Sequence, residues 1–161
     1  MTQVFLGLGS NLDREKNIRA GLDALKKLFG DLKFSNIYES ESVGFKGSNF
    51  YNLVVSLQTD LTIAELSEAL KKIEDENGRV RTGPKYSPRT LDIDILTYGD
   101  FVGIEAGVEL PRAEITENAF VLLPLSELAP DALHPYLKKS YAELWASYDQ
   151  NTQVLWKITL L

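Results

Sequence analysis

The chain has 161 residues, 44% of them hydrophobic, which predicts a single globular domain over residues 1–161. Its formal net charge of -6 disfavours nucleic-acid and anionic-membrane partners, since phosphate-rich surfaces repel an acidic protein on average. Cysteine is absent, which excludes disulfides and thiolate metal sites, and no apolar run reaches the roughly 18 to 20 residues of a membrane span, so we expect a cytoplasmic protein.

The first part of the chain alternates between strand and helix patterns. An apolar run over Val4–Leu8 predicts a buried strand that enters a tight turn at Gly9-Ser10-Asn11. Apolar residues then recur at spacings of three and four up to Gly30, which predicts a helix with a glycine C-cap. A second strand is expected over residues 32–38, followed by a long loop over residues 40–49.

The middle of the chain repeats this alternation. Residues 50–59 alternate as a strand, and a capping-box signature at residues 62–65 opens a helix that ends at Asn77-Gly78. Residues 91–98 predict another strand, which a turn connects to a short strand over residues 101–104.

The last part of the chain favours further helices and one strand. Residues 117–128 look helical, with a break or kink expected at Pro124. A helix over residues 137–148 and a strand over residues 154–158 follow. The order β-α-β-β-α-β with added C-terminal elements predicts an α+β, ferredoxin-like sandwich with a mainly antiparallel sheet.

Two acids in the expected strand over residues 91–98 are candidate metal ligands. Strand periodicity turns Asp92 and Asp94 away from the core and places them about 7 Å apart, from a rise near 3.4 Å per residue. Mg²⁺ prefers one or two carboxylates together with substrate phosphates and water. A solvent-facing strand edge with two ordinary acids is the alternative.

A basic run precedes these acids. Eleven residues without an acid contain Arg79, Arg81, Lys85 and Arg89. Guanidinium groups stay charged and bind phosphate oxygens in bidentate fashion. The run therefore predicts a site for Mg²⁺ and polyphosphate together, with a solvated basic loop as the alternative.

Other patterns indicate a small ligand rather than covalent catalysis. Residues 7–12 lack the third glycine of a dinucleotide fingerprint and the lysine of a P-loop. Phe50 and Asn52 share a strand face, which suits a flat heterocycle, although packing is the alternative. The single histidine, His134, lies in a loop and is expected at the surface without a catalytic role.

Taken together, these motifs resemble the 6-hydroxymethyl-7,8-dihydropterin pyrophosphokinase family over essentially the whole chain. The matching segments are Gly7–Leu12, Phe50–Asn52, Gly78–Arg81, Ser87–Ile95 and Phe120–Leu125. The resemblance implies that the enzyme transfers diphosphate from ATP to the hydroxymethyl pterin in folate biosynthesis and releases AMP. It also implies small-molecule substrates, a monomer, and no nucleic-acid or membrane partner.

The resemblance assigns roles to individual residues. Catalytic roles fall to Arg79, Arg89, Asp92 and Asp94, and the two aspartates would hold two Mg²⁺ ions. Nucleotide contacts fall to Glu74, Arg81, Lys85, Ile95 and Arg112. Pterin contacts fall to Ser40, Val43, Phe50, Asn52 and Phe120, with the two phenylalanines on either side of the ring.

Two positions depart from the family pattern. The family commonly has a histidine where Arg112 stands and an arginine where Asn118 stands, and both groups normally contact ATP phosphates. Arg112 keeps a cation, whereas Asn118 loses one. A degenerate pterin-binding or nucleotide-binding homologue with weak turnover is therefore an alternative. An RNA-binding ferredoxin-like module is disfavoured by the acidic pI.

Overall fold

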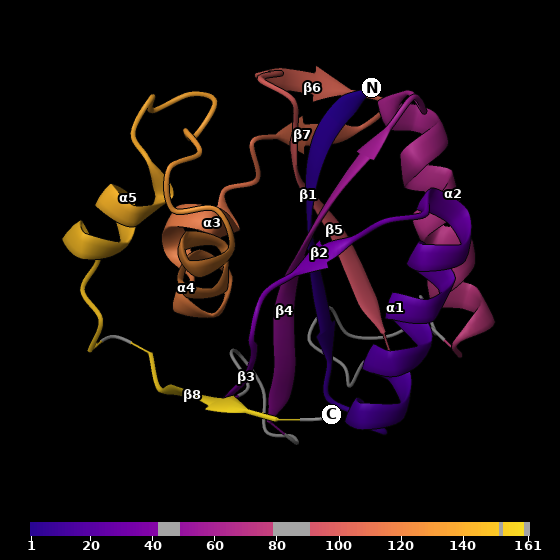
Figure 1. Cartoon of the computed structure of the whole chain (residues 1–161), viewed down its shortest axis with the longest axis horizontal. Helices are drawn as coiled ribbons and strands as arrows, with labels where there is room; N and C mark the ends of the chain where they lie inside the picture. Colours follow the sequence, from indigo (N-terminus) through magenta and orange to yellow (C-terminus); the bar gives the residue numbers. More distant parts are fainter. Residues whose placement is uncertain (42–48, 79–90, 152, 160–161) are drawn as a thin grey trace.

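The computed structural model of the protein describes residues 1–41, 49–78, 91–151 and 153–159. A β-sheet forms the middle layer of the molecule (Figure 1). Its strands are β1 (Thr2–Ser10), β2 (Lys33–Phe34), β3 (Ile37–Ser40), β4 (Phe50–Thr59), β5 (Asp92–Tyr98) and β8 (Leu155–Ile158). They stand in the order β5-β1-β4-β3-β8, with β2 paired to β4, and the pairs are antiparallel.

Helices lie on both faces of this sheet (Figure 1). One face carries α1 (Arg14–Phe29) and α2 (Ile63–Glu76), and the other carries α3 (Glu114–Glu117), α4 (Ala119–Leu128) and α5 (Tyr141–Ser147). A separate hairpin joins β6 (Gly103–Glu105) to β7 (Val108–Leu110). The path β1-α1-β3-β4-α2-β5 is the ferredoxin-like arrangement, so the predicted fold class is confirmed.

Each face of the sheet has its own hydrophobic core. Val4, Leu6 and Leu8 of β1 pack with α1 and α2, whereas Phe5 packs with α4 and α5 on the opposite face. Successive strand residues point to opposite faces, so a strand covered on both sides becomes a continuous apolar run. The strand interval 4–8 was predicted from this run, and the structure extends it through Gly9 to Ser10.

Local capping signals set several of the helix ends. Thr62 and Glu65 form the predicted capping box at the start of α2, and Gly30 has a positive φ of 79° at the end of α1. A second capping box, between Ser140 and Glu143, starts α5 at residue 141. The helix expected over residues 137–148 is therefore shorter than predicted.

Of the break or kink expected at Pro124, the break is wrong. Helix α4 continues through Pro124, and the chain instead breaks at Asn118, whose backbone is extended between α3 and α4. Pro124 is buried, and packing against the sheet sustains the helix where a backbone hydrogen bond is missing.

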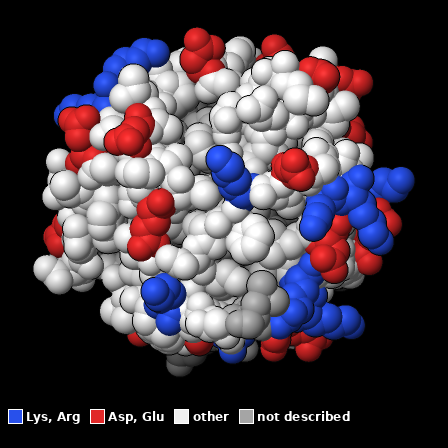
Figure 2. Space-filling view, viewed as in Figure 1, with Lys and Arg blue, Asp and Glu red and all other residues white. Residues whose placement is uncertain are grey.

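The described residues contain no helix long and apolar enough to cross a membrane. On the face seen in Figure 2, uncharged residues cover much of the middle, and both acidic and basic side chains occur toward its edges.

His134 is buried, with 5% of its surface exposed, so the surface position expected from the sequence is wrong. Its Nδ1 accepts hydrogen bonds from the backbone N–H groups of Tyr136 and Leu137, at 3.2 and 3.1 Å. The ring also packs edge-on against Tyr141. A short turn thus closes around the imidazole, and burial lowers the pKa of His134.

Acidification is expected to destabilise the fold through His134. Because its pKa is lowered in the folded state, its contribution is complete above a pH of about 6.5 and is lost as the pH falls through the folded-state pKa. Thermal melts between about pH 8 and pH 5 should show a larger loss of Tm for the wild type than for His134→Gln. Equal losses in both proteins would contradict this role.

Candidate active site

A cavity of about 510 Å³ opens on the sheet face that carries α4. Its floor consists of the adjacent ends of β4, β1 and β5, and its wall is the segment from Arg112 to Val121. Strands far apart in the sequence therefore bring the predicted pterin residues and the predicted metal ligands into one cavity.

Two glycines of β1 leave the middle of the cavity floor without side chains. Gly9 pairs with Asn52 on one side and Asp92 on the other, and Gly7 stands two residues along the same strand. A Cβ atom added at Gly9 would lie 2.9 Å from Oδ1 of Asn52, and one at Gly7 would lie 3.4 Å from the Leu96 side chain. The turn predicted at Gly9-Ser10-Asn11 begins only after Ser10, because Gly7 and Gly9 lie within the strand, where they allow close approach to the backbone.

The β4 side of the cavity carries the residues predicted to bind a pterin. Asn52 is 8% exposed, and its Nδ2 donates a hydrogen bond to Oγ of Ser40 at 3.0 Å. This bond fixes the amide at the edge of the cavity. Phe50 and Phe120 line the same cavity from β4 and α4. Val43 lies outside the described residues.

The β5 side carries the two aspartates. Asp92 and Asp94 face the cavity while Ile93 and Ile95 are buried in the core, so the predicted alternation is confirmed. Burial, together with the carboxylates of Asp92 and Glu74, raises the pKa of Asp94 to about 7, although the Arg112 guanidinium opposes this shift. Two neighbouring carboxylates disfavour each other's charged form, and a bound cation relieves this repulsion.

These residues fit a hard divalent cation. The aspartates supply oxygen ligands from one strand face, and both are partly accessible rather than sealed in the core. Among the described residues, no group of three or more His, Cys, Asp or Glu side chains could hold a metal alone. Mg²⁺ is usually bound by one or two carboxylates, with phosphate and water oxygens completing its coordination.

Glu74 fixes the strand that carries the aspartates. It extends from α2, is 5% exposed, and its Oε2 accepts a hydrogen bond from the backbone N–H of Ile93 at 2.7 Å. The residue thus held stands between Asp92 and Asp94. A second cavity of about 270 Å³ lies beside Glu74 and Ile95, and both aspartates line this cavity as well.

Arg112 lies where the two cavities meet. Its Nη2 is 3.6 Å from Oδ1 of Asp94, and its Nε donates a hydrogen bond to Glu114 at 2.5 Å. Its backbone N–H also donates to the carbonyl of Leu96 at 2.9 Å. The Asp94 and Glu114 carboxylates raise the pKa of Arg112 against the effect of burial, so the guanidinium remains charged.

Sequence reasoning missed several residues of the cavity. Glu114 and Glu117 line its wall, and Gln153 holds the start of α4. Oε1 of Gln153 accepts from the N–H of Ala119 at 2.7 Å, and its Nε2 donates to Oδ1 of Asn118 at 3.0 Å. A lone glutamine 33 residues beyond Phe120 gives no local signal of such a cap.

The basic run was predicted to bind phosphates. Its members Arg79, Arg81, Lys85 and Arg89 lie outside the described residues. Their roles stay predictions.

Comparison with known proteins identifies relatives of this chain. A model of the family 7,8-dihydro-6-hydroxymethylpterin-pyrophosphokinase (HPPK) matches residues 5–130. A 2-amino-4-hydroxy-6-hydroxymethyldihydropteridine pyrophosphokinase of Aquifex aeolicus is 37% identical over 145 residues, which cover 89% of this chain and 90% of that protein. The protein of the same name from Pseudomonas aeruginosa is 39% identical, over 83% of this chain and 84% of its own length.

Other relatives are longer than this chain. A folic acid synthesis protein of Dictyostelium discoideum is 38% identical over 83% of this chain, which matches only 20% of that protein. A crystal structure of Plasmodium falciparum HPPK-DHPS has a TM-score of 0.70 at 16% identity and covers 91% of this chain and 43% of its own, so it supports the fold. The family match spans most of the chain, and the chain belongs to the 7,8-dihydro-6-hydroxymethylpterin-pyrophosphokinase family.

Proposed function

We propose that the protein transfers the terminal diphosphate of ATP to 6-hydroxymethyl-7,8-dihydropterin, which yields AMP and the pterin diphosphate in folate biosynthesis. Its relatives from Aquifex aeolicus and Pseudomonas aeruginosa carry the name of this pyrophosphokinase. The observation that supports the proposal most directly is the single cavity in which Asn52 and Phe50 face the aspartate pair across a glycine floor.

The pterin occupies the β4 side of the cavity in this proposal. Its ring lies between Phe50 and Phe120, and Asn52 reads the polar edge of the ring while Ser40 holds the amide. Val43 contributes to the same pocket. An aromatic sandwich with one buried amide suits a flat heterocycle that carries donors and acceptors along one edge.

ATP occupies the β5 side. Asp92 and Asp94 hold two Mg²⁺ ions, which neutralise phosphate charge when they are bound. Arg79 and Arg89 add charge stabilisation at the transferred group. The nucleotide contacts are Glu74, Arg81, Lys85, Ile95 and Arg112. The protein works as a cytoplasmic monomer on small-molecule substrates, without a nucleic-acid or membrane partner.

The chemistry follows from positioning. The pterin hydroxyl oxygen forms a bond to the β-phosphorus of ATP, the bond from that phosphorus to the α-phosphate oxygen breaks, and AMP leaves with the electron pair. The hydroxyl proton is released to solvent. The protein aligns the two substrates and places its cations beside the phosphates, and such positioning and charge stabilisation supply most of the catalysis in this class of transfer.

Product analysis tests this function. Wild-type protein incubated with ATP, Mg²⁺ and the hydroxymethyl pterin should produce AMP and pterin diphosphate in equal amounts, and AMP should not appear when the pterin is omitted. Pterin binding without AMP formation would identify the degenerate homologue instead. That alternative gains some support from Asn118, whose side chain bonds to Gln153 at a position where the family commonly has an arginine.

Arg112→Ala is expected to raise the KM for ATP by about tenfold, equivalent to roughly 1.4 kcal/mol, and to leave the pterin KM unchanged. The guanidinium lies beside Asp94, one of the two carboxylates that would hold the cation, so its charge would also attract the ATP phosphates. Steady-state ATP titrations measure the effect. A KM for ATP within twofold of the wild type would show that Arg112 does not bind phosphate, and rescue by Asn118→Arg would show that both positions serve the same group.

A further inference from the structure

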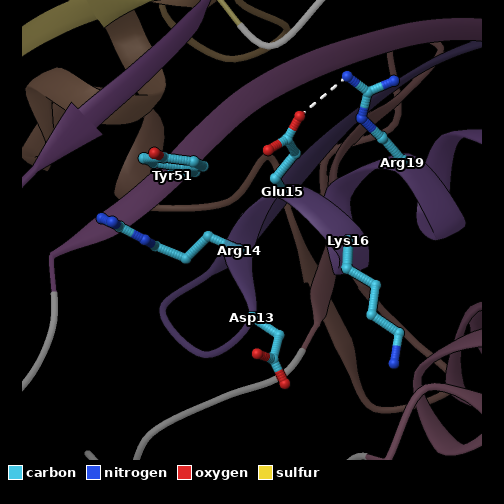
Figure 3. Close-up of a pocket in the computed structure, with 6 residues that line it drawn as sticks. All are labelled: Asp13, Arg14, Glu15, Lys16, Arg19 and Tyr51. Carbon is cyan, nitrogen blue, oxygen red and sulfur yellow. Dashed lines mark hydrogen bonds and ion pairs between the residues drawn. The ribbon is translucent and has the colours of Figure 1, made fainter.

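A shallow hollow of about 610 Å³ lies at the start of α1, on the face of the sheet that carries α1 and α2. Asp13, Arg14, Glu15, Lys16, Arg19 and Tyr51 line it (Figure 3). Arg14 extends toward the Tyr51 ring, whereas Glu15 turns to Arg19 on the same helix (Figure 3). Arg14 therefore leaves its own helix to contact the sheet.

The Arg14 guanidinium contacts Glu39 of β3, Tyr51 of β4 and Asn49, which immediately precedes β4. Its Nη1 donates to Oε2 of Glu39 at 3.0 Å and to the carbonyl oxygen of Asn49 at 3.1 Å. Its Cζ lies 4.1 Å from the centre of the Tyr51 ring. Nδ2 of Asn49 donates to the same Glu39 oxygen at 3.2 Å, which closes the network.

This network is partly buried, which strengthens the attraction between its charges. The side chains of Arg14 and Glu39 are 28% and 18% exposed, so solvent screens their attraction less than it screens a surface pair. The planar guanidinium stacks on Tyr51 and forms hydrogen bonds at its rim at the same time. A lysine ammonium could not reproduce both contacts.

The residues that Arg14 holds are the chain neighbours of the predicted pterin contacts. Glu39 precedes Ser40, Asn49 precedes Phe50, and Tyr51 lies between Phe50 and Asn52. In the β3–β4 ladder Glu39 pairs with Tyr51 and Ser40 pairs with Phe50. Because successive strand residues face opposite sides, a clamp on Glu39 and Tyr51 from behind sets where Phe50 and Ser40 stand in front.

We propose that Arg14 is a positioning residue for the pterin side of the cavity. It ties the start of α1 to the paired ends of β3 and β4 and thereby holds Phe50 and Asn52 in their binding positions. This inference rests on the proposed function only in naming the pterin as the ligand of that side. Arg14 itself lies behind the sheet and is not a catalytic residue.

The test compares Arg14→Met with Arg19→Met. Methionine keeps an unbranched apolar side chain at position 14 and removes the guanidinium. Arg19 is the matched control, since it pairs with Glu15 at 2.9 Å on the same helix and both side chains are largely exposed. Calorimetric titration of the hydroxymethyl pterin, with and without a non-hydrolysable ATP analogue, measures binding independently of turnover.

Arg14→Met is expected to weaken pterin binding by about tenfold, because displacement of the strand ends misplaces the ring contacts. The affinity of Arg14→Met for the ATP analogue should stay within about twofold of the wild type. Arg14→Lys should also bind the pterin weakly, because lysine keeps the positive charge but lacks the planar guanidinium. In ligand-free protein, amide exchange over residues 49–52 should accelerate in Arg14→Met and stay unchanged over β5. Arg19→Met should match the wild type in every measurement.

Pterin affinity and exchange in Arg14→Met that equal those of Arg19→Met would overturn the positioning role. So would equal weakening of pterin and nucleotide binding, which would indicate general destabilisation. A wild-type protein that binds the pterin but forms no AMP would overturn the proposed function instead, and the binding comparison would still decide the role of Arg14.

Discussion

Asp92→Asn and Asp94→Asn are each expected to lower turnover by roughly 1000-fold or more at saturating substrates. Both carboxylates face the cavity from β5, and neither fills the core. Asparagine keeps the shape of each side chain and removes the charge that attracts a divalent cation. The effect should therefore fall on the chemical step and on the Mg²⁺ concentration needed for half-maximal rate.

Thermal melts in the presence of a chelator control for folding. Asp94→Asn should not melt below the wild type, because burial and the like-charged neighbours already disfavour ionisation of Asp94. Asp92→Asn should melt near the wild type, because Asp92 faces the cavity and does not fill the core. Asp100→Asn is the matched control, since Asp100 lies exposed in the turn after β5. Turnover near that of the wild type in both aspartate variants would rule out a carboxylate-held metal site.

Asn52→Ala is expected to weaken pterin binding by about 1 to 3 kcal/mol, or roughly 5- to 150-fold, and to leave ATP binding nearly unchanged. The amide is almost fully buried and is oriented by its bond to Ser40, so its loss leaves polar groups of the ring edge and of Ser40 without a partner. Calorimetric titration with each ligand separates the two effects.

Ser56→Ala provides a control on the same strand. Ser56 lies on the same face of β4 as Asn52 but away from the cavity, and its hydroxyl accepts a hydrogen bond from Gln3. Its replacement should leave both affinities unchanged. If Asn52→Ala reduced the affinity for ATP as strongly as that for the pterin, the assignment of the β4 side to the pterin would be wrong.

Local periodicity was enough to predict β1, β4 and β5 and the direction of the β5 side chains, whereas the single strand expected over residues 32–38 is two short strands, β2 and β3. The alternation over residues 91–98 correctly placed Asp92 and Asp94 opposite the core, and the capping box at Thr62 correctly placed the start of α2. These signals are encoded within a few neighbouring residues, which is why one sequence suffices to recognise them.

Features that depend on long-range packing were not predictable in this way. A glycine pair suggests a turn when read locally, and its role as a bare floor appears only once Gly9 stands between Asn52 and Asp92. Packing likewise carries α4 through Pro124, buries His134 inside its turn, and brings Gln153 to the start of α4. Each outcome was decided by partners distant in the sequence or by tertiary burial.

The position of β5 at the end of the sheet has a consequence for self-association. An outermost strand presents unpaired backbone groups that can recruit a strand from another chain and begin aggregation. Here the Ile93 N–H is taken by Glu74 and the Leu96 carbonyl by the Arg112 N–H, so part of this edge is already bonded. The carboxylates of Asp92 and Asp94 project beside this edge and would repel the same strand of a second copy. The groups that we propose for phosphate binding at β5 would thereby also protect this edge of the sheet against strand addition by a second chain.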